Sequence, residues 1–132
     1  MDLKDLLPKN DTINVELVYN DKLLVNEDGT PMTVEVYLPH TKVSKQIHYA
    51  QSNEYLKRQK SEDDFTLEEL VERGLDRLVG ITKGWNITFG EDDDGNKVKP
   101  KFSKKKAKEI YEALEFIPAC IQGAIQDNQD FT

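Results

Sequence analysis

The chain has 132 residues, which is single-domain length, and carries a formal net charge of -7 with 37% apolar and 33% charged residues. This acidic balance argues against nucleic acid or an anionic membrane as the main partner, and no run approaches the roughly 18 apolar residues of a membrane span. The single cysteine, Cys120, cannot form an internal disulfide, and the first residues lack a signal-peptide pattern, so we expect a cytoplasmic protein.

We expect one domain over residues 1–132, beginning with a loosely held lead segment at residues 1–10. Strand patterns follow over residues 12–39, where apolar side chains alternate with polar ones and turn signals separate the runs. The Asp28-Gly29 pair is a hairpin signal, because Gly supplies the positive φ that such a turn needs. The sequence predicts an antiparallel β-meander of about three strands, at residues 13–19, 22–26 and 32–38.

The helical part is expected over residues 44–132, and its first helix over residues 45–60. Ser44 is the expected N-cap of this helix, since a Ser hydroxyl can accept from the backbone amides of the first turn. Ile47, Ala50 and Leu56 are expected to face inward.

A second helix over residues 67–83 has the clearest start signal in the chain. Thr66 can accept from the amide of Glu69, whose carboxylate can reach back to the amide of Thr66, and Phe65 and Leu70 occupy the positions of a hydrophobic staple. Gly84 is the expected left-handed cap at the end of the helix. One apolar stripe is predicted along it, comprising Leu70, Val71, Leu75, Leu78 and Val79.

After an extended run at residues 86–89 and a polar turn at residues 91–96, two more helices are predicted. Ser103 is the expected N-cap of the first, with Ala107, Ile110, Tyr111 and Leu114 on one face, and Pro118 suits the first turn of the second. Ile121, Ala124 and Ile125 form the stripe of that last, short helix. The expected class is therefore α+β, with an N-terminal meander followed by three to four helices.

Residues that could carry chemistry occur without the spacing that chemistry requires. An EF-hand aligned with Gly95 at its sixth position would have Gly90 at the first and Lys101 at the twelfth, where oxygen ligands are needed. His40 and His48 lie outside any zinc-type cluster, and Cys120 has no catalytic His at a recognisable spacing. We expect no catalytic residues, no metal site, no cofactor and no enzymatic activity.

Seven lysines and no acid lie between Lys97 and Lys108, with Phe102 among them. Such a run can be a nucleic-acid patch, a contact for an acidic protein or a solvated helix start. The four carboxylates of Glu91 to Asp94 lie just before it and would neutralise much of its field. We therefore favour the solvated helix start.

Several aromatic and apolar side chains could contact a partner or complete the core. Trp85, Phe89 and Phe102 flank the acidic turn, where aromatic residues can act as binding anchors but more often seal a junction between helices. Core packing is the favoured interpretation for Trp85, whereas Phe131 either docks back on the helices or meets a partner. The candidate partner-binding residues are Trp85, Phe89, Phe102, Tyr111, Ile125 and Phe131.

The run from Leu75 to Asn86, in which a helix ends in Gly84-Trp85, resembles a run in the tail assembly chaperones of long-tailed bacteriophages. As in those proteins, an acidic Asp-Gly turn and an aromatic-Ser helix start, here Phe102-Ser103, come next. The chain has Asp130 where that family usually has Asn, so the match is weaker at that point. The resemblance also includes Ala107, Tyr111, Ile121-Gln122, Ala124-Ile125, Asp127 and Phe131.

This resemblance implies a non-enzymatic protein of the host cell cytoplasm that binds the tape-measure protein, the tail-tube protein or both before the tail polymerises, with homo-oligomers possible. One alternative is a structural virion component, either a minor tail or a head-tail protein, that stays in the particle. A second alternative is an acidic inhibitor of a host nucleic-acid enzyme. That role would need carboxylates spaced along one face, whereas the acids of this chain cluster in turns and helix starts.

Overall fold

Alternating β-branched residues form the central sheet of the computed structural model, which describes residues 2–130. Strands β1 (Thr12–Glu16), β4 (Thr33–Tyr37) and β5 (Thr82–Asn86) are antiparallel and lie in the order β1-β4-β5. Val15 of β1 pairs with Val34 of β4, and Val34 and Val36 are completely buried. With four helices following the N-terminal strands, the α+β class predicted from the sequence is confirmed.

The third strand of the sheet is not the one that the sequence indicates. The run at residues 22–26 contributes only β3 (Lys22–Leu23), which pairs with β2 (Val18–Tyr19) in a separate two-stranded ribbon. The ribbon closes at Asn20 and Asp21, which both have positive φ. The side-chain amide of buried Asn26 donates to Asn86 O at 3.3 Å, so the loop after β3 lies against the end of β5 and adds no strand to the sheet. The edge of the sheet next to β4 is thereby left to β5.

Four helices follow the pattern of the sequence, with shifted ends: α1 (Lys42–Lys60), α2 (Leu67–Ile81), α3 (Lys104–Ala113) and α4 (Phe116–Asp130). A short 3-10 helix, η1 (Leu3–Leu6), precedes the sheet. Helix α1 starts three residues before its predicted start, because the side chain of Thr41, and not of Ser44, caps it. None of the helices within residues 2–130 is long and apolar enough to cross a membrane.

Helix α2 ends at Ile81, and the expected left-handed cap at Gly84 is wrong. Thr82 is extended, with φ -74° and ψ 125°, and Gly84 lies within β5 opposite Glu35. Pairing with β4 satisfies the backbone groups of this segment, so the helix gives way directly to a strand.

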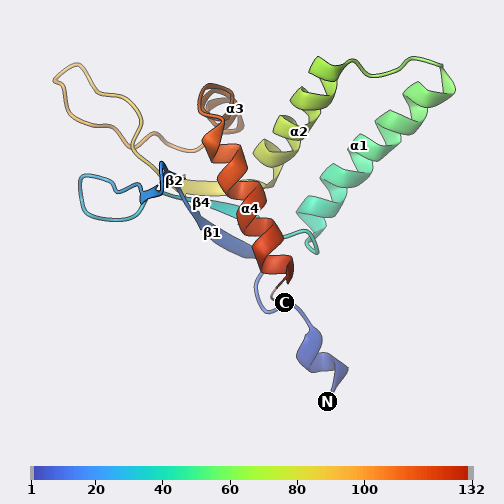
Figure 1. The fold of residues 1–132 in the computed structure, drawn as a ribbon, viewed down its shortest axis with the longest axis horizontal. Helices are drawn as coiled ribbons and strands as arrows, with labels where there is room; N and C mark the ends of the chain where they lie inside the picture. The colour runs from blue at the N-terminus through green and yellow to red at the C-terminus, as the bar shows by residue number, and fades with distance from the viewer. Residues whose placement is uncertain (1, 131–132) are drawn as a thin grey trace.

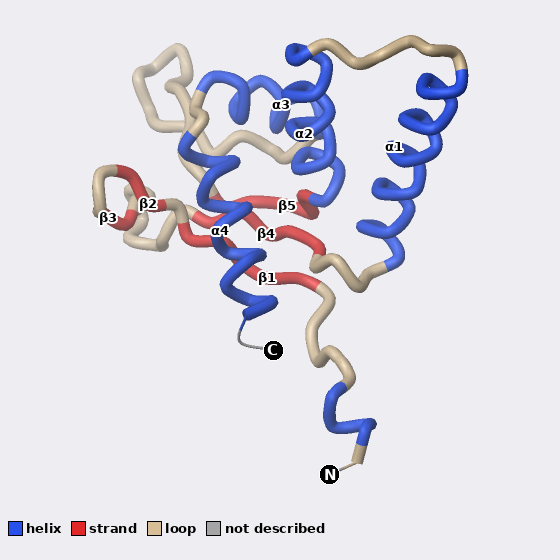
Figure 2. The backbone as a smooth tube through the Cα atoms, turned by 45° about the vertical axis from the view of Figure 1, so that its right-hand side comes forward, coloured by secondary structure: helices blue, strands red, loops and turns tan. Residues whose placement is uncertain are grey.

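The core lies where α2, α3 and α4 gather over the sheet, with α1 at the outer side of this group (Figures 1 and 2). Tyr111, Ile110 and Ile121 are its largest fully buried helical side chains. Two inward positions expected on α1 are wrong, since Ala50 is exposed and Leu56 is 54% exposed. Only Ile47 of the predicted inward set packs against the core, and it is half-buried.

Candidate functional site

Helix α2 begins where the sequence predicts, because its first turn is capped reciprocally. The amide of Glu69 donates to Thr66 Oγ1 at 3.1 Å, and the amide of Thr66 donates to Glu69 Oε1 at 3.1 Å. Two of the amides that a helix start leaves unpaired are thus satisfied. From this start the apolar side chains recur at helical spacing as one stripe.

The apolar stripe of α2 extends beyond the core that it helps to build. Leu78 and Ile81, near its C-terminal end, are 2% and 7% exposed. From its end at β5, α2 rises away from the sheet toward the loop that joins it to α1, so its first turns lie beyond the sheet (Figure 1). In these turns Leu67 is 73%, Leu70 47% and Val71 67% exposed. We call Leu67, Leu70 and Val71 the α2 ridge.

Sequence reasoning places two of the ridge residues, Leu70 and Val71, in the core stripe and leaves Leu67 out. The spacing of the stripe correctly identifies a single face, but it carries no information about where the sheet beneath ends. The stripe itself therefore gives no signal of which of its ends stays exposed.

Helix α1 leaves the ridge uncovered because it meets α2 along a narrow and mostly polar seam. Near the C-terminal end of α2 the contact is apolar and close, since a Cβ on Gly80 would lie only 2.7 Å from Cδ1 of Ile47. Above it, the amide of Gln51 donates to Arg73 O at 2.8 Å, and the Arg73 guanidinium donates to Gln51 O at 2.7 Å. Tyr49 and Leu56 are half a helical turn away from this seam and are 59% and 54% exposed. On α1 the seam comprises Ile47, Gln51, Glu54 and Arg58.

The upper end of the seam is an ion-pair cluster around an aromatic ring. Arg58 Nη1 lies 2.5 Å from Glu69 Oε2, and this ion pair, aided by the Thr66 amide, lowers the pKa of Glu69 to about 2. The guanidinium carbons of Arg58 and Arg73 lie 3.8 and 4.3 Å from the centre of the Phe65 ring. These cation–π contacts fix the α1–α2 turn without burying the ridge.

Three of the predicted partner-binding residues form the junction between β5 and the loop before α3. Trp85 Nε1 donates to Pro100 O at 2.8 Å, and the ring of Trp85 meets that of Phe102 edge-on at 5.0 Å. Phe89 is also half-buried against the core, and the Lys106 ammonium lies 5.2 Å from its ring centre. These contacts favour the junction-sealing role that the sequence already suggests for Trp85.

The other predicted partner-binding residues are scattered. Tyr111 is 1% exposed and its hydroxyl lies 2.8 Å from Thr82 Oγ1, so its side chain cannot contact a partner in the folded protein and this prediction is wrong. Ile125 is half-buried and lines a groove between α1 and α4. Phe131 lies outside the described residues.

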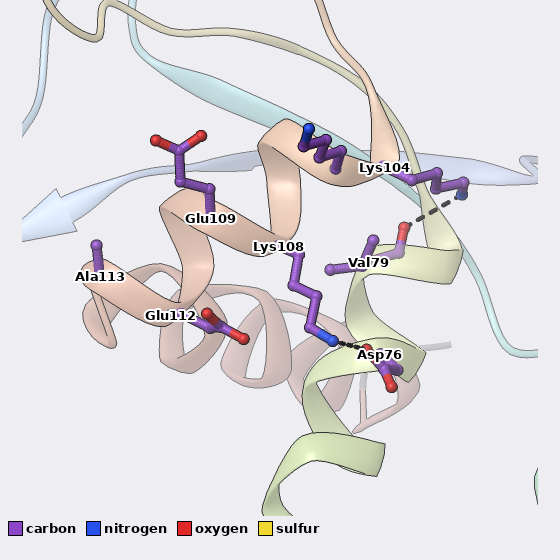
Figure 3. A pocket seen from close by; sticks show the side chains of 8 residues that line it. Asp76, Val79, Lys104, Lys108, Glu109, Glu112 and Ala113 are labelled. Carbon is purple, nitrogen blue, oxygen red and sulfur yellow. Dashed lines mark hydrogen bonds and ion pairs between the residues drawn. The ribbon is translucent and has the colours of Figure 1, made fainter.

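The lysine run is largely tied to the protein itself. Lys108 Nζ lies 2.8 Å from Glu72 Oε1 and 3.2 Å from Asp76 Oδ1, across a shallow hollow between α2 and α3 (Figure 3). Lys104 donates to Gly80 O at 2.8 Å and Val79 O at 3.2 Å, at the end of α2. Within residues 2–130 only two of the seven lysines have no polar partner, Lys101 and Lys105. This pairing supports the solvated helix start over a nucleic-acid patch.

The acidic turn has a local explanation as well. Asp92 Oδ1 accepts from the amides of Asp94 at 3.0 Å and Asn96 at 2.8 Å, and Gly95 has a φ of 80°. Within residues 2–130 no three His, Cys, Asp or Glu side chains gather in a way that could hold a metal ion. The Asp92 carboxylate therefore shapes the turn.

Comparison of the chain with protein families, with curated proteins and with solved structures finds no match.

Proposed function

We propose that this protein is a phage tail assembly chaperone that binds the tape-measure protein, the tail-tube protein or both before the tail polymerises. The observation that carries the proposal is the α2 ridge, where Leu67 and Val71 are 73% and 67% exposed on a helix whose C-terminal end is buried in the core. Contiguous exposed apolar side chains in a soluble domain are typical of a site that docks another polypeptide. The resemblance to tail assembly chaperones, which covers about residues 34–131 and is strongest after Phe65, suggests which polypeptide that is.

A tape-measure protein is a long amphipathic helix, and such a helix can lay its apolar face on the ridge. Burying a Leu or Val side chain contributes about 1.5 to 3 kcal/mol, and association itself costs several kcal/mol. Three such residues therefore support binding that is reversible, as a chaperone that leaves the finished particle requires. The net charge of -7 would keep the complex soluble while the tail assembles.

The test is co-expression of the tape-measure protein with this chain, followed by measurement of the soluble fraction and pull-down. We expect the wild-type chain to keep the tape-measure protein soluble and the Leu67→Ser/Val71→Ser variant to lose most of this effect. The control is Leu23→Ser/Val25→Ser, which removes two other exposed apolar side chains, 44% and 51% exposed, from the β2–β3 region. A tape-measure protein that is equally soluble without this chain would refute the proposal.

Mass spectrometry of purified virions separates the chaperone from the alternative of a structural virion component. A chaperone should be absent from mature particles, whereas a minor tail or head-tail protein would be present in stoichiometric amount. Tight binding to a host nuclease, with no binding to any tail protein, would instead favour the acidic inhibitor.

A further inference from the structure

A groove of about 500 Å³ lies between α1 and α4, below the ridge on the same side of α2. Its deepest residues are Leu78 and Ile81 of α2, and the half-buried side chains of Tyr37 and Ile125 complete its apolar surface. Helical spacing links this groove to the ridge, since positions 67, 71, 74, 78 and 81 fall on one face of α2.

The rim of the groove is basic. Lys45 and His48 come from α1 and Arg77 from α2, and no carboxylate of the described residues lines the groove. Lys45 and Arg77 form no ion pair with another described residue, unlike Arg58 and Arg73 higher on the same helices. The groove is thus matched to a short amphipathic segment with a net negative charge.

The chain itself carries a segment of this kind at residues 2–7. Leu3, Leu6 and Leu7 are 78%, 63% and 61% exposed, and η1 has no buried residue. Their spacing of i, i+3 and i+4 places the three leucines on one side of a helical turn. Asp2 caps that turn by accepting from the amide of Lys4 at 2.9 Å, and Asp5 adds a second carboxylate, so the segment carries two acids against the one lysine, Lys4.

We propose that residues 2–7 of one copy dock into the α1–α4 groove of a second copy, so that the protein self-associates. In its own chain the segment extends away from the sheet and helices (Figures 1 and 2), as a segment that reaches a neighbour must. A second hollow lies where this segment joins the rest of the chain. It shares two lining residues, Pro39 and Gln129, with the α1–α4 groove. Reciprocal docking therefore brings two copies together at adjoining surfaces and closes a dimer. This self-association is independent of the binding of a tail protein to the α2 ridge.

Sedimentation equilibrium from about 10 µM to about 1 mM tests the proposal. We expect concentration-dependent dimerisation of the wild-type chain and at least about tenfold weaker dimerisation of Leu6→Ser/Leu7→Ser. Arg77→Glu should weaken it similarly, and mixing Arg77→Glu with Asp5→Arg chains should restore association through the reversed charge pair. A fluorescein-labelled peptide of residues 2–10 should bind the wild-type chain and lose affinity for Arg77→Glu.

The control is Leu67→Ser/Val71→Ser, which alters the α2 ridge. It should leave dimerisation unchanged and lower the soluble fraction of the co-expressed tape-measure protein. Circular dichroism verifies that each variant is folded. A wild-type chain that stays monomeric throughout would overturn the proposal, whether the segment stays free or folds back into its own groove. Dimerisation that persists in Leu6→Ser/Leu7→Ser would overturn it too. Either result leaves the proposed chaperone function standing.

Discussion

Tyr111 shows how the surroundings of one side chain decide its role. Its spacing from Ala107 and Ile110 correctly predicts the inward face of α3, but aromatic character alone made it a candidate partner contact as well. In the structure its hydroxyl meets Thr82 Oγ1 at 2.8 Å, and Thr82 Oγ1 donates to Leu78 O at 2.8 Å. A residue 29 positions away in sequence therefore satisfies the buried hydroxyl, which local spacing cannot reveal.

We expect Tyr111→Phe to lower the free energy of unfolding at pH 7 by about 1 kcal/mol, because a buried hydrogen bond is lost. Burial raises the pKa of Tyr111 to about 12 from its ordinary value of 10.0. The folded state then holds the phenolic proton more tightly than the unfolded state, so this stabilisation is complete below pH 10 and is lost as the pH rises toward 12. Urea titrations between pH 7 and 12 measure both effects.

As the pH rises above 10, ionisation of Tyr111 should lower the free energy of unfolding of the wild-type chain by about 2 to 3 kcal/mol in total. Other titrating groups add their own contributions. Tyr111→Phe removes this component but starts about 1 kcal/mol less stable, so the two free energies of unfolding should become equal between pH 10 and 12, and the variant should be the more stable protein at pH 12. Parallel curves for the two proteins would show that Tyr111 ionises equally in the folded and unfolded states.

Lys104 and Lys105 are neighbours in the lysine run, yet the structure gives them different roles. Lys104 donates to Val79 O and Gly80 O at the C-terminal end of α2, where carbonyls lack helical partners and a cation is favoured, and burial lowers its pKa. We expect Lys104→Ala to lower the free energy of unfolding by about 1 to 2 kcal/mol. Lys105→Ala, at an exposed position, should change it by less than about 0.5 kcal/mol. Chemical denaturation of both variants is the measurement, and equal effects would contradict the capping role.

At the scale of elements, capping signals correctly predict the starts of α2 and α3, whereas the start of α1 is missed by three residues. The Thr66–Glu69 capping box and the Ser103 cap lie within one turn of the residues they serve, so the sequence alone reveals them. The end of α2 depends on pairing of β5 with β4, and the seam of α1 depends on which face α2 presents. The end of α2 cannot be derived from the helix itself. On α1, however, helical spacing alone places Leu56 half a turn from Ile47, so the two cannot both face inward.

Two glycines of α2 provide a matched test of the α1–α2 seam. Gly74 has no neighbour within 4 Å of an added Cβ, so Gly74→Ala should raise the free energy of unfolding by about 0.5 to 1 kcal/mol through its helix propensity. At Gly80 the added Cβ would lie 2.7 Å from Ile47 Cδ1, and overpacking costs about 1 to 3 kcal/mol. Gly80→Ala should therefore lower stability by about 1 kcal/mol and reduce hydrogen-exchange protection in α1.

Ile47→Val supplies the control, because it removes Cδ1, the atom that the new Cβ would meet. The double variant Gly80→Ala/Ile47→Val should be more stable than the sum of the two single changes predicts, by about 1 kcal/mol. An additive double variant would place the effect of Gly80→Ala elsewhere in the structure.

For the whole molecule, the sequence predicts the class but not how the sheet is assembled. Alternation identifies β1 and β4 as strands, whereas the short β5 contains Lys83 and Gly84 and has no strand pattern of its own. It becomes a strand because it follows directly after α2, whose end lies beside the free edge of β4, and can pair with that edge. The position of the α2 ridge has the same origin, since the sheet determines how much of α2 is covered.

Because β4 lies between β1 and β5, the sheet joins the first 40 residues to the helices, and we expect the molecule to unfold as one cooperative unit. A fragment of residues 42–132 keeps all four helices but loses Val15, Val34 and Val36, which are 2%, 0% and 0% exposed. It should therefore show no cooperative urea transition by Trp85 fluorescence or circular dichroism. Residues 8–132, which lack only η1 and its exposed leucines, should unfold like the full chain. A sigmoidal transition in the fragment of residues 42–132 would show instead that the helices form a core of their own and that the sheet merely packs against it.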